Sequence, residues 1–133
     1  MFLYLLNDKE GKAFIELAIQ AMNIKGDKNT YCDKAEYEGF LTELNLPDYQ
    51  AVGLSLEDAT AEFKSSSKQV KRSVIIELCC ILYADKELDN DKMQWIYKLA
   101  EKFGITKPET ERLVSWSKDY SDFIEVGLLY INA

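Results

Sequence analysis

Apolar residues recur along the first third of the chain at the spacing of one face of an α-helix. Asn7 and Glu10 match a capping box, in which each residue caps the backbone of the other at a helix start. The apolar stripe that follows is Phe14, Leu17, Ala18, Ala21 and Met22. A second stripe is Tyr37, Phe40, Leu41 and Leu44. The pattern predicts one helix from about residue 7 to residues 24–26 and a second that ends before Pro47, because proline cannot continue an upstream helix.

The middle of the chain contains the most hydrophobic stretch. Ser55 and Asp58 match another capping box and predict a short helix, which the serines at 65–67 should weaken. Its apolar residues are Leu56, Ala59 and Phe63. Residues 74–84 are then apolar almost all round, apart from Glu77. Such a segment suits a buried helix about which the others pack.

Three more helices are expected after residue 92. Their stripes are Met93, Ile96, Tyr97, Ala100 and Phe103, then Leu113, Trp116 and Tyr120, and finally Phe123, Val126 and Tyr130. Gly104 should end the first of them, and Thr106 with Glu109 should cap the second. No segment alternates polar and apolar residues as a half-buried strand does. We therefore expect an all-α fold, a single compact bundle of about six or seven helices in one domain spanning residues 1–133.

The two halves of the chain share a short acidic pattern. Residues 27–34 (DKNTYCDK) and 85–92 (DKELDNDK) both read DK-x4-DK, and each lies between an apolar helix and an amphipathic one. The match needs a one-residue shift to align the apolar residues that follow it. It predicts a pseudo-duplicated unit of helix, acidic loop and helix.

Charge and residue usage exclude several classes of function. With 23 acidic and 16 basic residues the net charge is −7, which repels the phosphates of nucleic acid. No apolar run approaches the roughly 20 residues that span a bilayer, so direct membrane insertion is not expected. The three cysteines form no CxxC pair and are odd in number, which favours a reducing cytoplasm over a disulfide framework.

Enzyme motifs are missing as well. The chain has no histidine, which removes Ser-His and Cys-His nucleophiles, HExxH metalloproteases and Cys2His2 zinc sites. It has no GxxxxGK[ST], GxGxxG or GxSxG motif, and thus no standard phosphate loop or nucleophile elbow. Catalysis is the third choice of function, and we expect a binding protein rather than an enzyme.

The second acidic loop is the best candidate for chemistry. Asp85, Glu87, Asp89 and Asp91 place four carboxylates within seven residues, and Ca²⁺ takes about 6–8 oxygen ligands. The loop is not an EF-hand, because neither the turn glycine nor the terminal glutamate is present. Asp27 and Asp33 are the first-half counterparts. These six residues are the predicted ligands of a weakly bound divalent cation, Ca²⁺ before others.

A purely structural interpretation of the same residues stays open. Asp89 or Asn90 could cap the helix that follows, Asp91 would suit its positive first turn, and Asp85 could close the preceding loop. Cys79 and Cys80 are expected in the core, since free cysteine is among the most buried residue types.

The region around the second acidic loop resembles the TerB-like family. The resemblance rests on residues 81–91 (ILYADKELDND), followed by Ile96, Leu99, Ala100 and the triplet Phe103-Gly104-Ile105. Lys86 departs from the family pattern, which usually has a glycine at that turn. The resemblance implies a tellurite-resistance-type or related stress context, in which such domains are associated with divalent cations and partner proteins.

Two functions from different classes follow. The first is a TerB-like accessory or sensor domain that binds divalent cations through its acidic loops. The alternative is a helical protein–protein interaction module whose acidic loops are only helix caps. An exposed, contiguous hydrophobic surface would favour the alternative. The partner and the oligomeric state cannot be derived from the sequence.

Overall fold

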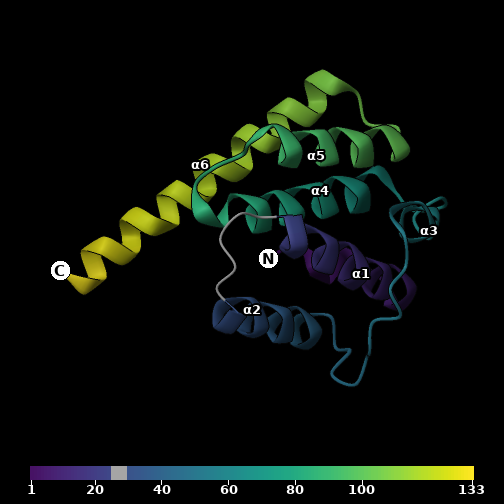
Figure 1. Ribbon diagram of the computed structural model, residues 1–133, viewed down its shortest axis with the longest axis horizontal. Helices are drawn as coiled ribbons and strands as arrows, with labels where there is room; N and C mark the ends of the chain where they lie inside the picture. The colour runs from purple at the N-terminus through teal and green to yellow at the C-terminus, as the bar shows by residue number, and fades with distance from the viewer. Residues whose placement is uncertain (25–29) are drawn as a thin grey trace.

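The computed structural model describes residues 1–24 and 30–133, except for the side chains of residues 30–33. The described residues form six α-helices and two 3-10 turns, with no strand, which confirms the all-α prediction (Figure 1). The helices are α1 (Asp8–Ile24), α2 (Thr30–Glu43), α3 (Leu56–Ala61), α4 (Lys68–Leu82), α5 (Asn90–Lys102) and α6 (Lys107–Asn132). The turns are η1 (Leu3–Leu5) and η2 (Tyr83–Asp85).

The helices begin where their capping residues predict. Asn7 and Glu10 exchange hydrogen bonds at the start of α1, with each backbone N–H donating to the other side chain at 2.9 Å. Ser55 and Thr106 likewise accept the N–H of the residue three positions on, at 3.0 and 3.3 Å. One start was missed: Ser67 accepts the N–H of Val70 at 3.2 Å and begins α4 six residues before the apolar run.

The core is built around α4, as its apolar composition predicts. This helix contacts α1, α5, α6 and both 3-10 turns. Its residues Val74, Ile75, Leu78, Ile81 and Leu82 have no solvent-exposed surface. Edge-to-face aromatic pairs fill two sides of the core, Phe14 with Phe40 and Phe63 with Phe103, at centroid distances of 5.3 and 5.2 Å.

The end of the chain corrects one prediction. The last two predicted helices are a single helix of 26 residues, α6. No glycine or proline stands between Tyr120 and Phe123, so nothing interrupts the hydrogen-bonded backbone there. The helix is about 39 Å long at 1.5 Å per residue. Its first half lies against α4 and α5, and its second half projects beyond the other helices (Figure 1). None of the described helices is long and apolar enough to cross a membrane.

Candidate functional site

The second acidic loop joins α4 to α5 through η2. Asp85 is the last residue of η2, and α5 begins at Asn90. Of the first-half counterparts, Asp27 lies outside the described residues, and Asp33 lies in α2 with its side chain not described. Ile24, the last residue of α1, lines the same surface groove as Asp91. The end of α1 therefore lies beside the first turns of α5.

The centre of the second loop is a buried lysine. The side chain of Lys92 has no exposed surface. Its Nζ lies 2.7 Å from Oδ1 of Asp85 and donates to the backbone carbonyl of Glu87 at 2.6 Å. A buried charge is tolerated only when it is paired and hydrogen-bonded. The loop thus folds its oxygens around an ammonium group that the chain itself supplies.

The other acidic side chains of the loop have separate positions. Asp89 is the N-cap of α5 and accepts the N–H of Lys92 at 3.0 Å, as the structural interpretation predicts. Asp91 lies in the first turn of α5, where the helix dipole favours an acidic residue. Both residues are exposed, as is Glu87. Among the described residues, no group of three His, Cys, Asp or Glu side chains could hold a metal ion.

The positions of these carboxylates affect how the loop could bind a cation. Of the four carboxylates predicted as ligands, that of Asp85 already contacts the Lys92 ammonium. A divalent cation at Asp85 would have to displace this ammonium or lie beside it, and two like charges at such a distance repel. Cation binding by this loop stays a prediction.

Lys86 occupies the backbone position at which the loop reverses direction. Its φ is 64° and its ψ 21°, the left-handed conformation that a glycine adopts without strain. Its Nζ lies 3.2 Å from Asp122 Oδ1 and 2.9 Å from Glu125 Oε2, and 5.0 Å from the ring centre of Tyr83. Burial alone would lower the pKa of Lys86, but the two carboxylates raise it above its usual value. The loop is thereby tied to the point where α6 leaves the body.

A buried carboxylate organises the segment between α2 and α3. Glu16 of α1 is 2% exposed. It accepts the Tyr49 hydroxyl at 2.6 Å and the backbone N–H groups of Val52, Gly53 and Leu54 at 3.0, 2.9 and 2.9 Å. Burial alone would raise the pKa of Glu16, but these four donors lower it below its usual value. The carboxylate holds residues 49–54 against α1.

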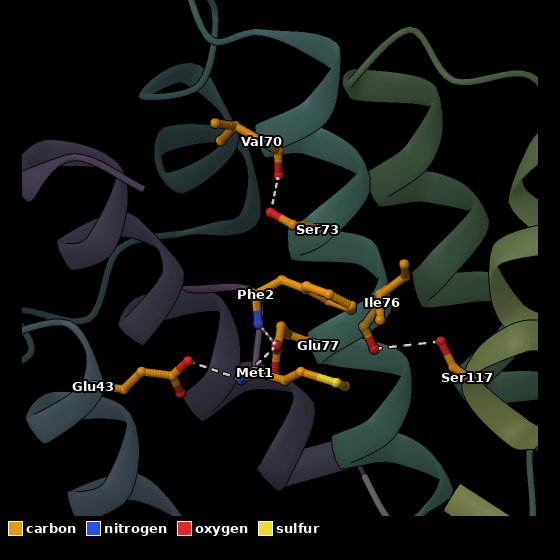
Figure 2. A network of polar contacts seen from close by, with 8 residues as sticks. All are labelled: Met1, Phe2, Glu43, Val70, Ser73, Ile76, Glu77 and Ser117. Atoms are coloured by element: carbon orange, nitrogen blue, oxygen red, sulfur yellow. Dashed lines mark hydrogen bonds and ion pairs between the residues drawn. The ribbon is translucent and has the colours of Figure 1, made fainter. Parts of the chain in front are cut away.

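A second buried carboxylate lies in the middle of α4 (Figure 2). Glu77 accepts the N–H of Phe2 at 2.7 Å, and its Oε1 is 2.9 Å from the amino group of Met1. That amino group is also 2.8 Å from Glu43 of α2. The same view shows the hydroxyl of Ser117 in α6 donating to the Ile76 carbonyl at 3.4 Å. The one acid in the apolar run thus connects α4 to the segment that precedes α1.

The two described cysteines are in the core region, as predicted. Cys79 is buried and Cys80 partly buried, and both are free thiols. Burial raises the pKa of both thiols, so neither is poised as a thiolate at neutral pH.

Most of the exposed large apolar side chains among the described residues lie at the end of α6. We call residues 123–131 the α6 tip. Seven of its nine side chains are large and apolar, and each is at least 43% exposed. They are Phe123, Ile124, Val126, Leu128, Leu129, Tyr130 and Ile131. Beyond residue 121 no residue of α6 is buried, and the ion pair between Glu125 and Lys86 links the tip to the acidic loop.

Three buried charged residues were not assigned a role from the sequence, although the pattern around each indicates burial. Lys92 stands four residues before Ile96 and therefore on the apolar face of α5. An exposed lysine is not expected on that face. Glu16 is the single acid among apolar residues 13–19, as Glu77 is in residues 74–84. A lone charged residue in an apolar run indicates a buried partner, whose identity depends on the tertiary fold.

Comparisons of the chain with models of protein families, with curated proteins and with solved structures find no significant match.

Proposed function

We propose that this chain is a TerB-like helical interaction module that binds a protein partner through the α6 tip, and that it is a binding protein rather than an enzyme. In this proposal the acidic loop is structural: Asp89 caps α5, and Asp85 with the Glu87 carbonyl encloses the Lys92 ammonium. The proposed setting is the cytoplasm, in a tellurite-resistance-type or stress context.

The observation that carries the proposal is the exposure of the α6 tip. Phe123, Tyr130 and Ile131 are 77%, 79% and 79% exposed. Large exposed apolar patches of this kind mark interaction sites in water-soluble proteins. The tip projects beyond the other helices (Figure 1).

Helix propensity supports the same proposal. The tip contains phenylalanine, isoleucine, valine, tyrosine and a glycine, which are weaker helix formers than alanine or leucine. A short helical segment is marginal in water unless tertiary packing stabilises it. A partner that covers the tip would provide that packing and would remove the apolar side chains from water.

The left-handed Lys86 supports the family part of the proposal. It stands where the TerB-like pattern usually has glycine, and its φ of 64° is one that glycine adopts freely. The loop therefore contains a turn that a glycine at this position would suit, which supports the resemblance.

Site-specific photo-crosslinking in producing cells tests the proposal. A benzophenone side chain at position 130 should yield a discrete crosslinked adduct, and Phe123→Ser should abolish it. Position 52 is the matched control, because Val52 is an apolar residue with 73% exposure in the segment between α2 and α3. Equal labelling from positions 130 and 52, or no adduct from 130, would refute the proposal.

Cation binding by residues 85–91 is the competing proposal. It is tested by titrating the protein with Ca²⁺ at millimolar concentration and following backbone amide shifts. Saturable shifts confined to residues 85–92 would favour cation binding, and unchanged spectra would remove it.

A further inference from the structure

A glycine in the middle of the α6 tip has no role within one chain. A Cβ added at Gly127 would meet no atom within 4 Å, and its φ is not left-handed. Glycine inside a helix costs about 1 kcal/mol relative to alanine. The chain therefore carries a destabilising residue at a position where its own fold would accept a larger one.

Gly127 lies at the centre of an uncharged helix face. Helical neighbours on one face are three, four or seven residues apart. The face through Gly127, which we call the Gly127 face, contains Trp116, Tyr120, Phe123, Ile124, Gly127, Tyr130 and Ile131. The acids Asp122 and Glu125 project from the opposite side, where both pair with Lys86.

The Gly127 face is continuous with packed aromatic residues at the base of the helix. Trp116 stacks on Tyr120 with ring centres 5.3 Å apart and contacts Phe2 at 5.9 Å. Trp116 itself remains 42% exposed. Interface cores are rich in such aromatic residues and poor in charge.

We propose that the Gly127 face is covered by the same face of a second copy of this chain, with the two α6 helices antiparallel and crossing at Gly127. This inference rests on the proposed function and names the partner. The crossing places Phe123 of one copy opposite Ile131 of the other, and Ile124 opposite Tyr130. Large side chains then flank a glycine that lets the two backbones approach closely.

Charge does not oppose this pairing, because Asp122 and Glu125 lie on the side of α6 away from the Gly127 face, where both pair with Lys86. The antiparallel arrangement follows from the position of the other helices, which lie along the first half of α6 (Figure 1). A parallel pair would bring these helices of the two copies to the same end, whereas an antiparallel pair places them at opposite ends. An uncharged face also requires no oppositely charged partner, which suits pairing with itself.

The exposed surface of the chain leaves enough area for a stable interface. The chain exposes 7840 Å². A monomeric protein of 15.3 kDa exposes about 7100 Å². The excess of about 700 Å² is close to the about 800 Å² that each partner contributes to a stable interface.

Sedimentation equilibrium of the purified chain, from micromolar to near-millimolar concentration, tests the inference. The average mass should rise towards twice the 15.3 kDa of one chain. Gly127→Leu should hold the mass at one copy, because the larger side chain blocks the crossing while it favours the helix. Circular dichroism checks that this variant stays helical.

Two neighbouring substitutions distinguish dimerisation through the Gly127 face from non-specific hydrophobic association. Tyr130→Ser should abolish dimerisation, whereas Leu129→Ser should leave it intact, since Leu129 is 64% exposed but lies on the opposite side of the helix. In addition, Gly127→Cys should form a disulfide between copies under mild oxidation and Leu129→Cys should not, because only close Cα atoms can be bridged.

The results distinguish this inference from the function on which it rests. A wild-type mass of one copy over the whole range, or equal loss of dimer in both serine variants, would overturn dimerisation. If position 130 still crosslinks to a different protein in cells, the proposed function stands and its partner is heterologous. If position 130 also fails to crosslink, both proposals fall.

Discussion

Two loops of this molecule are built around buried charges of opposite sign. Residues 49–54 surround the carboxylate of Glu16 with three backbone N–H groups and the Tyr49 hydroxyl. Residues 85–89 surround the ammonium of Lys92 with a carboxylate and a backbone carbonyl. One loop presents donors and the other presents acceptors, and in both a helix side chain supplies the complementary group.

The comparison shows why acidic composition alone is a poor guide to a metal site. The loop rich in carboxylates has a cation at its centre, but the chain provides that cation through Lys92 of α5. The loop that binds a carboxylate contains no basic residue at all between residues 49 and 54. The buried group in each loop, rather than the charge of the loop itself, decides what the loop can still bind.

The largest expected effect comes from removing the buried ammonium. Lys92→Met keeps most of the side-chain volume but takes the positive charge away from Asp85, which should lower the free energy of unfolding by about 4 kcal/mol. Urea denaturation measures the change. Lys98→Met is the matched control, because Lys98 is an exposed lysine of the same helix and its loss should cost less than about 0.5 kcal/mol.

A second variant makes this result specific to charge. Asp85→Asn added to Lys92→Met should recover part of the lost stability, since the neutral side chain no longer needs the ammonium and can still accept the Glu87 N–H, now 3.2 Å from Asp85 Oδ1. If the double variant is less stable than Lys92→Met alone, the pairing of these two charges does not organise the loop.

Removing the buried carboxylate charge of Glu16, around which residues 49–54 fold, should lower the free energy of unfolding by a smaller amount. Glu16→Gln replaces one acceptor oxygen by an amide NH2 group, which cannot accept a hydrogen bond from the surrounding N–H groups. This change should lower the free energy of unfolding by about 2–3 kcal/mol. The carboxylate has a lowered pKa in the folded state, so its contribution is present above the usual glutamate pKa of 4.5 and is lost as the pH falls through the lower, folded pKa. Wild type and variant should therefore converge in acid, and a gap that persists there would contradict this account.

The helix starts could be predicted because they depend on residues three positions apart. Asn7 and Glu10 cap α1 reciprocally, and Ser55 caps α3 by accepting the Asp58 N–H, as their spacing indicates. The central position of α4 followed from its apolar composition, which leaves it no stable place in water. The last helix boundary was wrong, because two helices were predicted where no glycine or proline separates Tyr120 from Phe123 and α6 continues without a break.

The buried charges could not be paired in advance, because their partners lie far along the chain. Glu16 meets residues 49–54, and Glu77 meets Phe2, 75 positions away. Lys92 is the local exception, seven residues from Asp85. Its position at the apolar spacing of α5 was not recognised from the sequence, and only the fold of the loop shows that its ammonium reaches Asp85.

Removing one donor from the carboxylate-centred loop should have a moderate effect. Tyr49→Phe deletes the 2.6 Å hydrogen bond to Glu16 and should cost about 1.5 kcal/mol at neutral pH. Burial, followed by the hydrogen bond to Glu16 and its charge, raises the pKa of Tyr49 to about 12. This contribution is complete below about pH 10, the value for a free tyrosine, and is lost as the pH rises through 12. Denaturation midpoints at neutral and alkaline pH measure both, and an unchanged midpoint at neutral pH would mean that Tyr49 does not hold the loop.

Ca²⁺ binding should have the smallest effect on stability, and it tests most directly whether the buried group of each loop decides what the loop can bind. If the ammonium occupies the place of a cation, wild type should show no saturable amide shifts in residues 85–92 at millimolar Ca²⁺. Lys92→Met exposes the Asp85 carboxylate and the Glu87 carbonyl to solvent cations, so it should gain such shifts. Ca²⁺ at ten times its Kd should then return about 1.4 kcal/mol of stability to this variant. Asp85→Asn in the same background should abolish the gain. Binding by wild type as tight as by Lys92→Met would show that the cation binds elsewhere on the loop and that the two buried charges do not decide what their loops accept.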